Sequence, residues 1–389
     1  MWTVRRIAVK MARRDFIAGM GGAAAALALG LGSGRAQGDE AATKLRWGLI
    51  GTGRRCWQHI RVIGRSPESE VIVAICDIQP ARMDAAEKLI ATPLTRYDKY
   101  QDLLARADLD VILVATPNYC HSEEVIAALG KGYDVLSEKP MGITSAECNA
   151  MIDAAKASGK ILQVGLQLRY SPFYGKVHSL LKDGIIGNLK YVWFNEFRGD
   201  WAKQSSDPEI DRKINWRFFN KLSGGTLVEK SCHYFDLFRW FIDSEPVRVV
   251  AMGGINVYDH RDTLDHATVA IEYANGCKAT HGLSMYAPHN QGFVLIGDKG
   301  SLELGFETNE IRVCRSGKAP EIIRVTADAK DTGGHVGTVE LHESFADCVR
   351  NRKAPLTDPI AGKESVRVGL AGELSVRESR PVKMSEIPA

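Results

Sequence analysis

The chain has 389 residues, a length typical of two domains rather than one. Its hydrophobic content of 45% and charged content of 25% are typical of a soluble globular protein. The net charge is only +3, part of it lies in the first 14 residues, and no stripe of Lys and Arg is present, which excludes nucleic acid as an expected partner.

The first 38 residues have a basic start, an apolar middle and a small-residue end. Arg13-Arg14 precedes an Ala- and Gly-rich run over 18–31, shorter than the ~20 strongly apolar residues of a membrane span. We expect residues 1–38 to be a twin-arginine signal peptide. This predicts a periplasmic or other extracytoplasmic location, export by the twin-arginine machinery and no stable membrane anchor. An uncleaved anchor or a poorly ordered extension is the alternative, and Met11 is an alternative start.

The segment after Lys44 predicts a strand–helix–strand unit. Apolar runs over 45–50 and 71–76 are the strands, and a glycine turn with an amphipathic stretch lies between them. Gly51 permits the tight turn, and Gly53 lets the backbone approach a pyrophosphate at the helix N-terminus. This arrangement predicts a dinucleotide site.

An acidic residue in the right place indicates which dinucleotide binds. Asp77 follows the second strand, where its carboxylate can accept hydrogen bonds from a ribose hydroxyl and would repel a 2′-phosphate. We therefore predict NAD, bound also by Thr52 and Arg54 of the turn, while Arg54 and Arg82 leave NADP as an alternative. Cys56 stands where a third glycine is usual.

Strand-like and helix-like runs continue to alternate up to residue 164. This alternation predicts a parallel sheet with both faces covered by helices and ligands at the C-terminal ends of the strands. The strands are expected over 110–115, 134–137 and 161–164, and the helices over 122–131 and 145–158.

Two polar clusters follow strands of this sheet: Thr-Pro-Asn-x-x-His at 116–121 and Glu-Lys-Pro at 138–140. The stretch "ATPNYCHSEEVIAALGKGYDVLSEKPMGIT" resembles the signature of the glucose–fructose oxidoreductase/inositol dehydrogenase (Gfo/Idh/MocA) family, and the resemblance extends over 44–384. It implies a Rossmann domain over 44–165 and a second α/β domain over 166–384. The second domain of that family has a large, mostly antiparallel sheet that often mediates homo-oligomers.

The second half indicates the same architecture by its own pattern. Asn275-Gly276 is a tight-turn signal, and strands joined by such short turns pair antiparallel. One face of the sheet must be covered by helices or by a second subunit. Strands are expected over 189–197, 247–257, 266–273, 277–285, 293–296, 301–304 and 311–314.

The polar clusters supply the candidate cofactor contacts. We interpret Thr116, Asn118 and Glu138 as such contacts, with His121 at the edge of the same site. The resemblance to the family implies that the segment with Gln167 lies beside the nicotinamide, so Gln167 is a further candidate cofactor contact.

The segment "GGTLVEKSCHYFDLFRW" contains the first candidate for catalysis. If it is helical from about Val228, then Glu229, His233 and Asp236 lie at i, i+4 and i+7, on one stripe. Flanking carboxylates orient an imidazole and tune its pKa toward neutrality. In the family, the corresponding His looks like the catalytic acid/base. Glu229 stands here where the family usually has Asp.

Lys139 is the second candidate. It follows a buried strand and precedes Pro140, which restricts its backbone to extended conformations. A lysine there, aimed at the nicotinamide and therefore counted also among the cofactor contacts, can donate a hydrogen bond to a substrate oxygen that becomes alkoxide-like. The candidate substrate-binding residues are Arg169, Tyr170, Trp216, Arg217 and Asp236, with Trp201 and Tyr286 as further aromatic candidates for a sugar pocket.

These patterns predict an exported NAD(P)-dependent oxidoreductase acting on a sugar or polyol. The export signal implies a tightly held dinucleotide that is loaded before export and recycled in place. A redox-neutral NAD-dependent glycosidase and a non-catalytic sugar-binding protein are the alternatives. The eight cysteines are scattered without zinc-site spacing, so no metal site is expected and the thiols are interpreted as mostly buried.

Overall fold

The computed structural model describes residues 44–305, 307–326 and 336–389. The predicted signal peptide, residues 1–38, lies outside this part of the chain, and residues 44–389 form one compact unit. Within the described ranges, no helix has the length and apolarity needed to span a bilayer.

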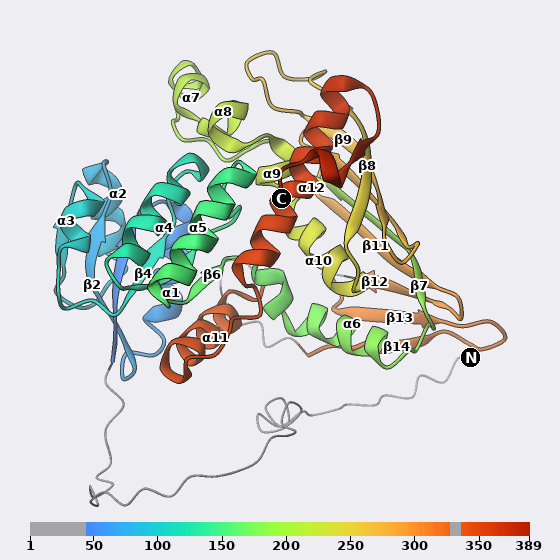
Figure 1. Cartoon of the computed structure of the whole chain (residues 1–389), viewed down its shortest axis with the longest axis horizontal. Helices are drawn as coiled ribbons and strands as arrows, with labels where there is room; N and C mark the ends of the chain where they lie inside the picture. The colour runs from blue at the N-terminus through green and yellow to red at the C-terminus, as the bar shows by residue number, and fades with distance from the viewer. Residues whose placement is uncertain (1–43, 306, 327–335) are drawn as a thin grey trace, which may run out of the picture. The chain divides into compact units, whose positions relative to one another are not determined.

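The first sheet has six parallel strands in the order β3-β2-β1-β4-β5-β6, seen at the left of Figure 1. Its central strands are buried almost throughout, as expected where helices cover both faces. The strands are β1 (Leu45–Ile50), β2 (Glu70–Cys76), β3 (Thr95–Tyr97), β4 (Val111–Val114), β5 (Asp134–Ser137) and β6 (Leu162–Val164).

Of the helices that connect these strands, the first and the last two lie where they were predicted, within one or two residues. The two short helices between β2 and β4, and the strand β3 between them, were not predicted. Most of these helices are short, and α5 has the best-defined ends: Thr144 accepts a hydrogen bond from the backbone N–H of Glu147, and Gly159 adopts a left-handed conformation after the last turn. The helices are α1 (Arg54–Ile63), α2 (Pro80–Glu87), α3 (Tyr100–Leu104), α4 (His121–Gly130) and α5 (Ser145–Ser158).

The second sheet has nine strands in the order β14-β13-β12-β11-β7-β10-β9-β8-β15 and confirms the expected mostly antiparallel architecture. Its one parallel pair joins β7 to β10, because the chain crosses the sheet between them. The pattern did not predict β14 or β15. The strands are β7 (Leu189–Phe197), β8 (Pro246–Gly254), β9 (His266–Tyr273), β10 (Lys278–Ser284), β11 (Asn290–Gly297), β12 (Ser301–Gly305), β13 (Glu310–Cys314), β14 (Glu321–Arg324) and β15 (Val382–Lys383).

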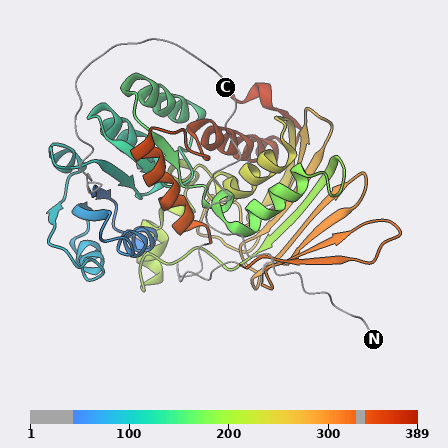
Figure 2. The same cartoon turned by 90° about the horizontal axis from the view of Figure 1, so that it is seen from below.

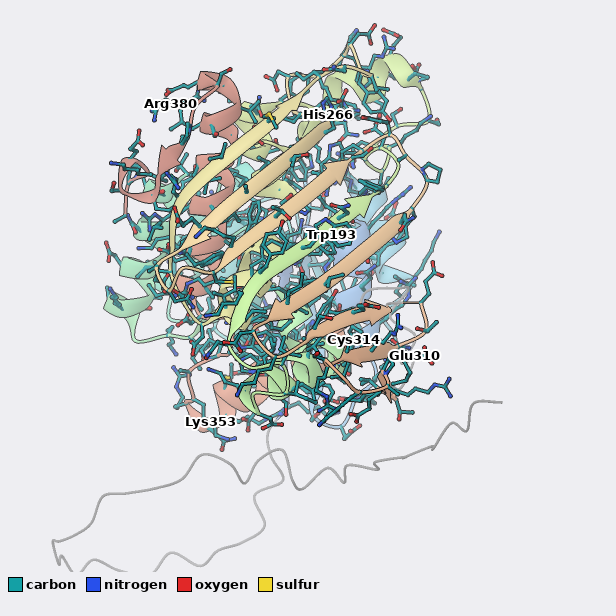
Figure 3. All side chains as sticks on the ribbon, turned by 90° about the vertical axis from the view of Figure 1, so that its right-hand side faces the viewer. Trp193, His266, Glu310, Cys314, Lys353 and Arg380 are labelled. Carbon is teal, nitrogen blue, oxygen red and sulfur yellow. The ribbon has the colours of Figure 1, made fainter. Side chains whose placement is uncertain are left out.

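Helices cover one face of this sheet, and Figure 2 shows them on its inner side. Along β7, side chains alternate: Phe194 and Glu196 are buried under the helices, whereas Trp193 lies on the open face that Figure 3 presents. The helices of this half are α6 (Pro172–Lys182), α7 (Pro208–Ile214), α8 (Asn220–Ser223), α9 (Thr226–Glu229), α10 (Cys232–Ile242) and α12 (Pro359–Glu378).

The C-terminal part of the chain returns to the first sheet. Helix α11 (Thr338–Asn351) packs against α1, and its Leu341 and Phe345 share a core cluster with Trp47. Helix α12 packs on both α5 and β8. Helices α11 and α12, which come last in the chain, thus contribute to the packing around the first sheet.

Candidate active site

The glycine turn after β1 forms an open cradle. Gly51 has φ +85°, and a Cβ there would lie 2.7 Å from the carbonyl carbon of Ala115, so only glycine fits. A Cβ on Gly53 would meet only Arg82, at 3.7 Å from a guanidinium nitrogen. Gly53 starts α1 with no side-chain cap, which leaves the first N–H groups of the helix available to an anion. These features fit the pyrophosphate of a dinucleotide.

Asp77 is held by the same turn. Its carboxylate accepts hydrogen bonds from the backbone N–H of Thr52 at 2.8 Å and from the Thr52 hydroxyl at 3.1 Å. A third comes from the backbone N–H of Gln79 at 2.9 Å. The carboxylate thus braces the turn and retains lone pairs for a ribose hydroxyl. Arg54 begins α1 with an exposed side chain.

Lys139 reaches from the end of β5 to the second half of the molecule. Its ammonium donates a hydrogen bond to the backbone oxygen of Glu229 at 2.8 Å and lies 3.4 Å from its carboxylate. Arg217 contacts the other oxygen of that carboxylate at 3.0 Å. Burial opposes the charged carboxylate, but Lys139 and Arg217 dominate and lower the pKa of Glu229 to about 2.

His233 lies in a different environment from the predicted one. The chain between α9 and α10 leaves the helix at Lys230 and Ser231, so Glu229 and His233 do not share one continuous helix. Burial and the charges of Lys139 and Lys230 lower the pKa of His233 well below its usual value. This direction is opposite to the expected tuning toward neutrality, because burial disfavours the charged imidazole and the nearby cations outweigh the carboxylate of Glu138.

Asp236 also has another partner than predicted. Its carboxylate forms a buried ion pair with Arg169, with contacts of 2.7 and 2.5 Å. The Arg169 guanidinium lies over the ring of Trp240. Both residues were predicted to bind substrate, but the structure engages each with the other, which fixes the loop after β6 to α10.

Glu138 belongs to a buried polar cluster that the sequence did not reveal. Arg55 contacts its carboxylate at 2.7 Å and His59 at 2.8 Å, and the other ring nitrogen of His59 adjoins His342 of α11. Although burial acts in the opposite direction, Arg55 and His59 hold the pKa of Glu138 well below its usual value. The cluster fixes Glu138, whose carboxylate accepts a hydrogen bond from the backbone N–H of Lys139. Glu138 therefore positions the backbone of Lys139.

The 116–121 cluster mainly fixes the loop after β4. The ring nitrogens of His121 lie 2.8 Å from the carbonyl of Pro140 and 3.0 Å from that of Thr116, which leaves neither nitrogen for a cofactor. The Thr116 hydroxyl donates to Glu124. Asn118 donates to the carbonyl of Ser223, across the two halves.

Some of the remaining predicted residues have a polar atom that is free to contact a ligand, and others are engaged with neighbouring residues of the fold. Gln167 is buried, and its side-chain oxygen has no partner among the described residues. This oxygen could accept a hydrogen bond from an amide N–H of a ligand. The Tyr170 hydroxyl is instead engaged with Thr357. Arg217 stacks on the indole rings of Trp216, at 4.1 Å, and Trp201, at 5.7 Å, whereas Tyr286 is exposed beside His266.

Neither a metal centre nor a disulfide appears in the described part of the chain. No group of three His, Cys, Asp or Glu side chains there is arranged to hold a metal ion. All eight cysteines are free thiols, and six of them are buried.

Glu229 should stabilise the fold in a pH-dependent manner. Because its folded pKa is depressed to about 2, its contribution is complete above the unfolded value near 4.5 and is lost as pH falls through 2. We expect Glu229→Gln to lower the free energy of unfolding by about 3 kcal/mol at pH 7 and by about half of that at pH 3. Urea denaturation from pH 3 to 7 measures this. The exposed Glu378→Gln is the control, and a deficit independent of pH would contradict the assignment.

The comparisons with known proteins agree with this geometry. Residues 45–166 match the model of the oxidoreductase family with an NAD-binding Rossmann fold, and residues 174–303 match the GFO/IDH/MocA C-terminal domain. The chain is 26% identical over 346 residues to scyllo-inositol 2-dehydrogenase (NAD(+)) of Bacillus subtilis, covering 88% of this chain and 96% of that protein.

Solved structures share the fold. Aldose-aldose oxidoreductase from Caulobacter crescentus, complexed with glycerol, has a TM-score of 0.75 at 22% identity, over 87% of this chain and 99% of that one. The WlbA dehydrogenase from Bordetella pertussis, in complex with NADH and UDP-GlcNAcA, has a TM-score of 0.74 at 23% identity, over 87% and 98%. The cradle, the Glu-Lys-Pro segment and these matches together show that the chain belongs to the Gfo/Idh/MocA family and is an NAD-binding oxidoreductase.

Proposed function

We propose that this enzyme oxidises a hydroxyl of a sugar or polyol, or reduces the corresponding ketone. The observation that carries the proposal is the convergence of Lys139 with Glu229 beside His233, at the end of the parallel sheet that carries the glycine cradle. A cation that donates and a neutral imidazole that accepts are the two groups that removal of a hydroxyl proton requires.

The residues of the chain divide the chemistry between them. Neutral His233 accepts the hydroxyl proton, and Lys139 donates a hydrogen bond to the oxygen as its negative charge grows. Glu229 and Glu138 hold Lys139 from its side chain and from its backbone. NAD, when bound, supplies the acceptor for the hydride that leaves the carbon. Gly51, Thr52, Gly53 and Asp77 would hold it.

The names of relatives support a sugar or polyol as the substrate class. Relatives in the family include inositol 2-dehydrogenases, such as the Lactiplantibacillus plantarum inositol 2-dehydrogenase/D-chiro-inositol 3-dehydrogenase, 24% identical over 262 residues. A screen of sugars and polyols, followed at the nicotinamide absorbance band, tests the proposal. Net reduction of NAD by at least one of them is expected. Release of an aglycone without net reduction, or binding without reaction, would overturn it in favour of a glycosidase or a binding protein.

We further propose that the chain is exported folded, with its NAD held tightly and recycled in place. The paired arginines at 13–14 support export. Retention is supported by Arg82, which lies beside Gly53 and donates to Gln204 of the second half at 3.0 Å, so that it spans the cofactor cradle. Mass spectrometry of periplasmic protein should find about one NAD per chain; empty, weakly binding protein would contradict the proposal.

A second copy of the chain is the proposed occupant of the open sheet face. Exposed apolar side chains on that face support this, and Trp193 lies near its centre in Figure 3. Light scattering should show a homo-oligomer, and Trp193→Glu should weaken it. A monomeric wild type at micromolar concentration would exclude this role of the face. The other exposed apolar residues of these strands are Val247, Val250, Met252, Ile296 and Ile322.

A further inference from the structure

The charged side chains around His233 form one connected network with unequal numbers of the two signs. Ion pairs, shared ring contacts and mutual electrostatic effects link them. The cations are Arg55, Lys139, Arg198, Arg217 and Lys230, and the carboxylates are Glu138, Glu196 and Glu229. With five cations and three carboxylates, the described residues of this network carry a surplus of two positive charges.

The first of the two surplus positive charges belongs to the pair of cations, Lys139 and Arg217, that share the carboxylate of Glu229. Its single carboxylate is shared by Lys139 at 3.4 Å and Arg217 at 3.0 Å, so one of these two cations is not neutralised. Lys230, by contrast, has a carboxylate of its own, that of Glu196 at 2.8 Å. The group formed by Lys139, Arg217 and Glu229 thus has a net positive charge, whereas the pair of Lys230 and Glu196 is neutral.

The second surplus charge is the guanidinium of Arg198. It directly follows β7, and its Nε donates to the carbonyl of Gly199 at 3.2 Å. No carboxylate in the described ranges forms an ion pair with it. Its guanidinium lies 5.5 Å from the ring centre of Trp201, the same indole that Arg217 contacts at 5.7 Å. One buried indole is thus contacted by two guanidinium groups, and a guanidinium group is well suited to bind the carboxylate or phosphate of a substrate.

The surplus of positive charge also affects His233, the candidate proton acceptor. Lys139 and Lys230 stabilise the neutral form of His233 and weaken it as a proton acceptor. An oxidised nicotinamide brings one more positive charge to this region. A substrate with a negative charge would offset both effects, whereas a neutral polyol would leave them in place.

We infer that the substrate of this site is an acidic sugar, carrying a carboxylate or a phosphate beside the hydroxyl that reacts. The inference rests on the proposed function, because it concerns the substrate of the same site. Arg198 and Arg217 are the residues that recognise the anion, with the bidentate geometry that guanidinium offers to either group. Trp201 is buried in the core of the second half and contacts both guanidinium groups through one ring.

Calorimetric titration of the NAD-loaded enzyme tests this with matched sugars that differ only in the acidic group. The probes are D-glucose against D-glucuronate and D-glucose 6-phosphate, and D-galactose against D-galacturonate. We expect the dissociation constant to be about tenfold lower for the acid in at least one pair, and the preference to shrink as salt is raised from 20 to 300 mM. A preference for the uronate assigns a carboxylate, and a preference for the phosphate ester assigns a phosphate.

Variants then locate the anion site. Arg198→Gln should reduce the tenfold preference to less than threefold, and Arg198→Lys, which keeps the charge and loses the bidentate geometry, should keep only part of it. Arg312→Gln, which removes an exposed arginine of β13 paired with Glu303, should leave it unchanged. Equal or tighter binding of the neutral sugar in every pair would overturn the inference. The readout is binding, so absence of turnover would count against the proposed function and not against this inference.

Discussion

Replacing Lys139 by methionine is expected to lower kcat by about 1,000-fold, with little change in NAD binding. The Lys139 ammonium is the donor placed at the junction of the two halves, held by the backbone oxygen and the carboxylate of Glu229. Methionine keeps an unbranched apolar side chain that is one atom shorter, and it removes the charge and its hydrogen bonds. The interaction strengthens as the substrate oxygen becomes anionic, so its loss falls on kcat rather than on KM.

Single-turnover kinetics with saturating NAD measure the effect, and bound NAD is titrated separately. Lys131→Met, at the exposed end of α4, is the matched control and should retain wild-type turnover. Lys139→Arg restores the charge with a different geometry and should recover part of the rate. Turnover of Lys139→Met within tenfold of wild type would remove this residue from the mechanism.

The His233→Asn variant is expected to lose about a factor of 1,000 in kcat, within the range found for general acid–base residues. Asparagine occupies similar space and keeps a polar head, but it cannot accept the proton. His233 has a ring nitrogen, Nδ1, that is buried without a partner among the described residues, so the substitution breaks few contacts within the protein. The loss should therefore be catalytic and leave the melting temperature within a few degrees.

The pH profile gives a second readout for His233. Its pKa is held well below the usual value, and the neutral form that accepts a proton is the one present above that pKa. Lowering the pH from 8 to 6 should therefore leave wild-type kcat/KM without an inflection from this group. An inflection near pH 6.5 that disappears in His233→Asn would contradict the assignment. His289→Asn, in an exposed turn, is the control.

The parts of the fold that depend on local pattern could be predicted from the sequence. The buried runs of β1, β4 and β5 and the tight turn at Gly51 depend on neighbouring residues, and the predicted positions match within one or two residues. Alternation and turn residues also predicted the strands from β7 to β13, although the end of β8 and the start of β11 differ from the predicted ranges by three residues. Short or edge strands such as β14 and β15 carry too few residues for a pattern to be visible.

Pairings between distant residues could not be predicted in this way. Arg169 lies 67 positions before Asp236, and His59 lies 283 positions before His342, yet both pairs are in contact. The predicted stripe depended on one uninterrupted helix from Glu229 to Asp236, and the break at Lys230 and Ser231 separates Glu229 from His233. His233 and Asp236 stay together on α10, but the Asp236 carboxylate pairs with Arg169. Electrostatics of a site depend on which partners the fold brings together, and local spacing does not specify them.

The return of α11 to the first sheet has a consequence for biosynthesis. Leu341 and Phe345 complete the core around Trp47, and His342 completes the cluster behind Glu138. A ribosome makes these residues long after β1 (Leu45–Ile50), because α11 lies far along the chain from that strand. The core around Trp47 and the cluster behind Glu138 therefore stay incomplete on the ribosome until synthesis has passed α11.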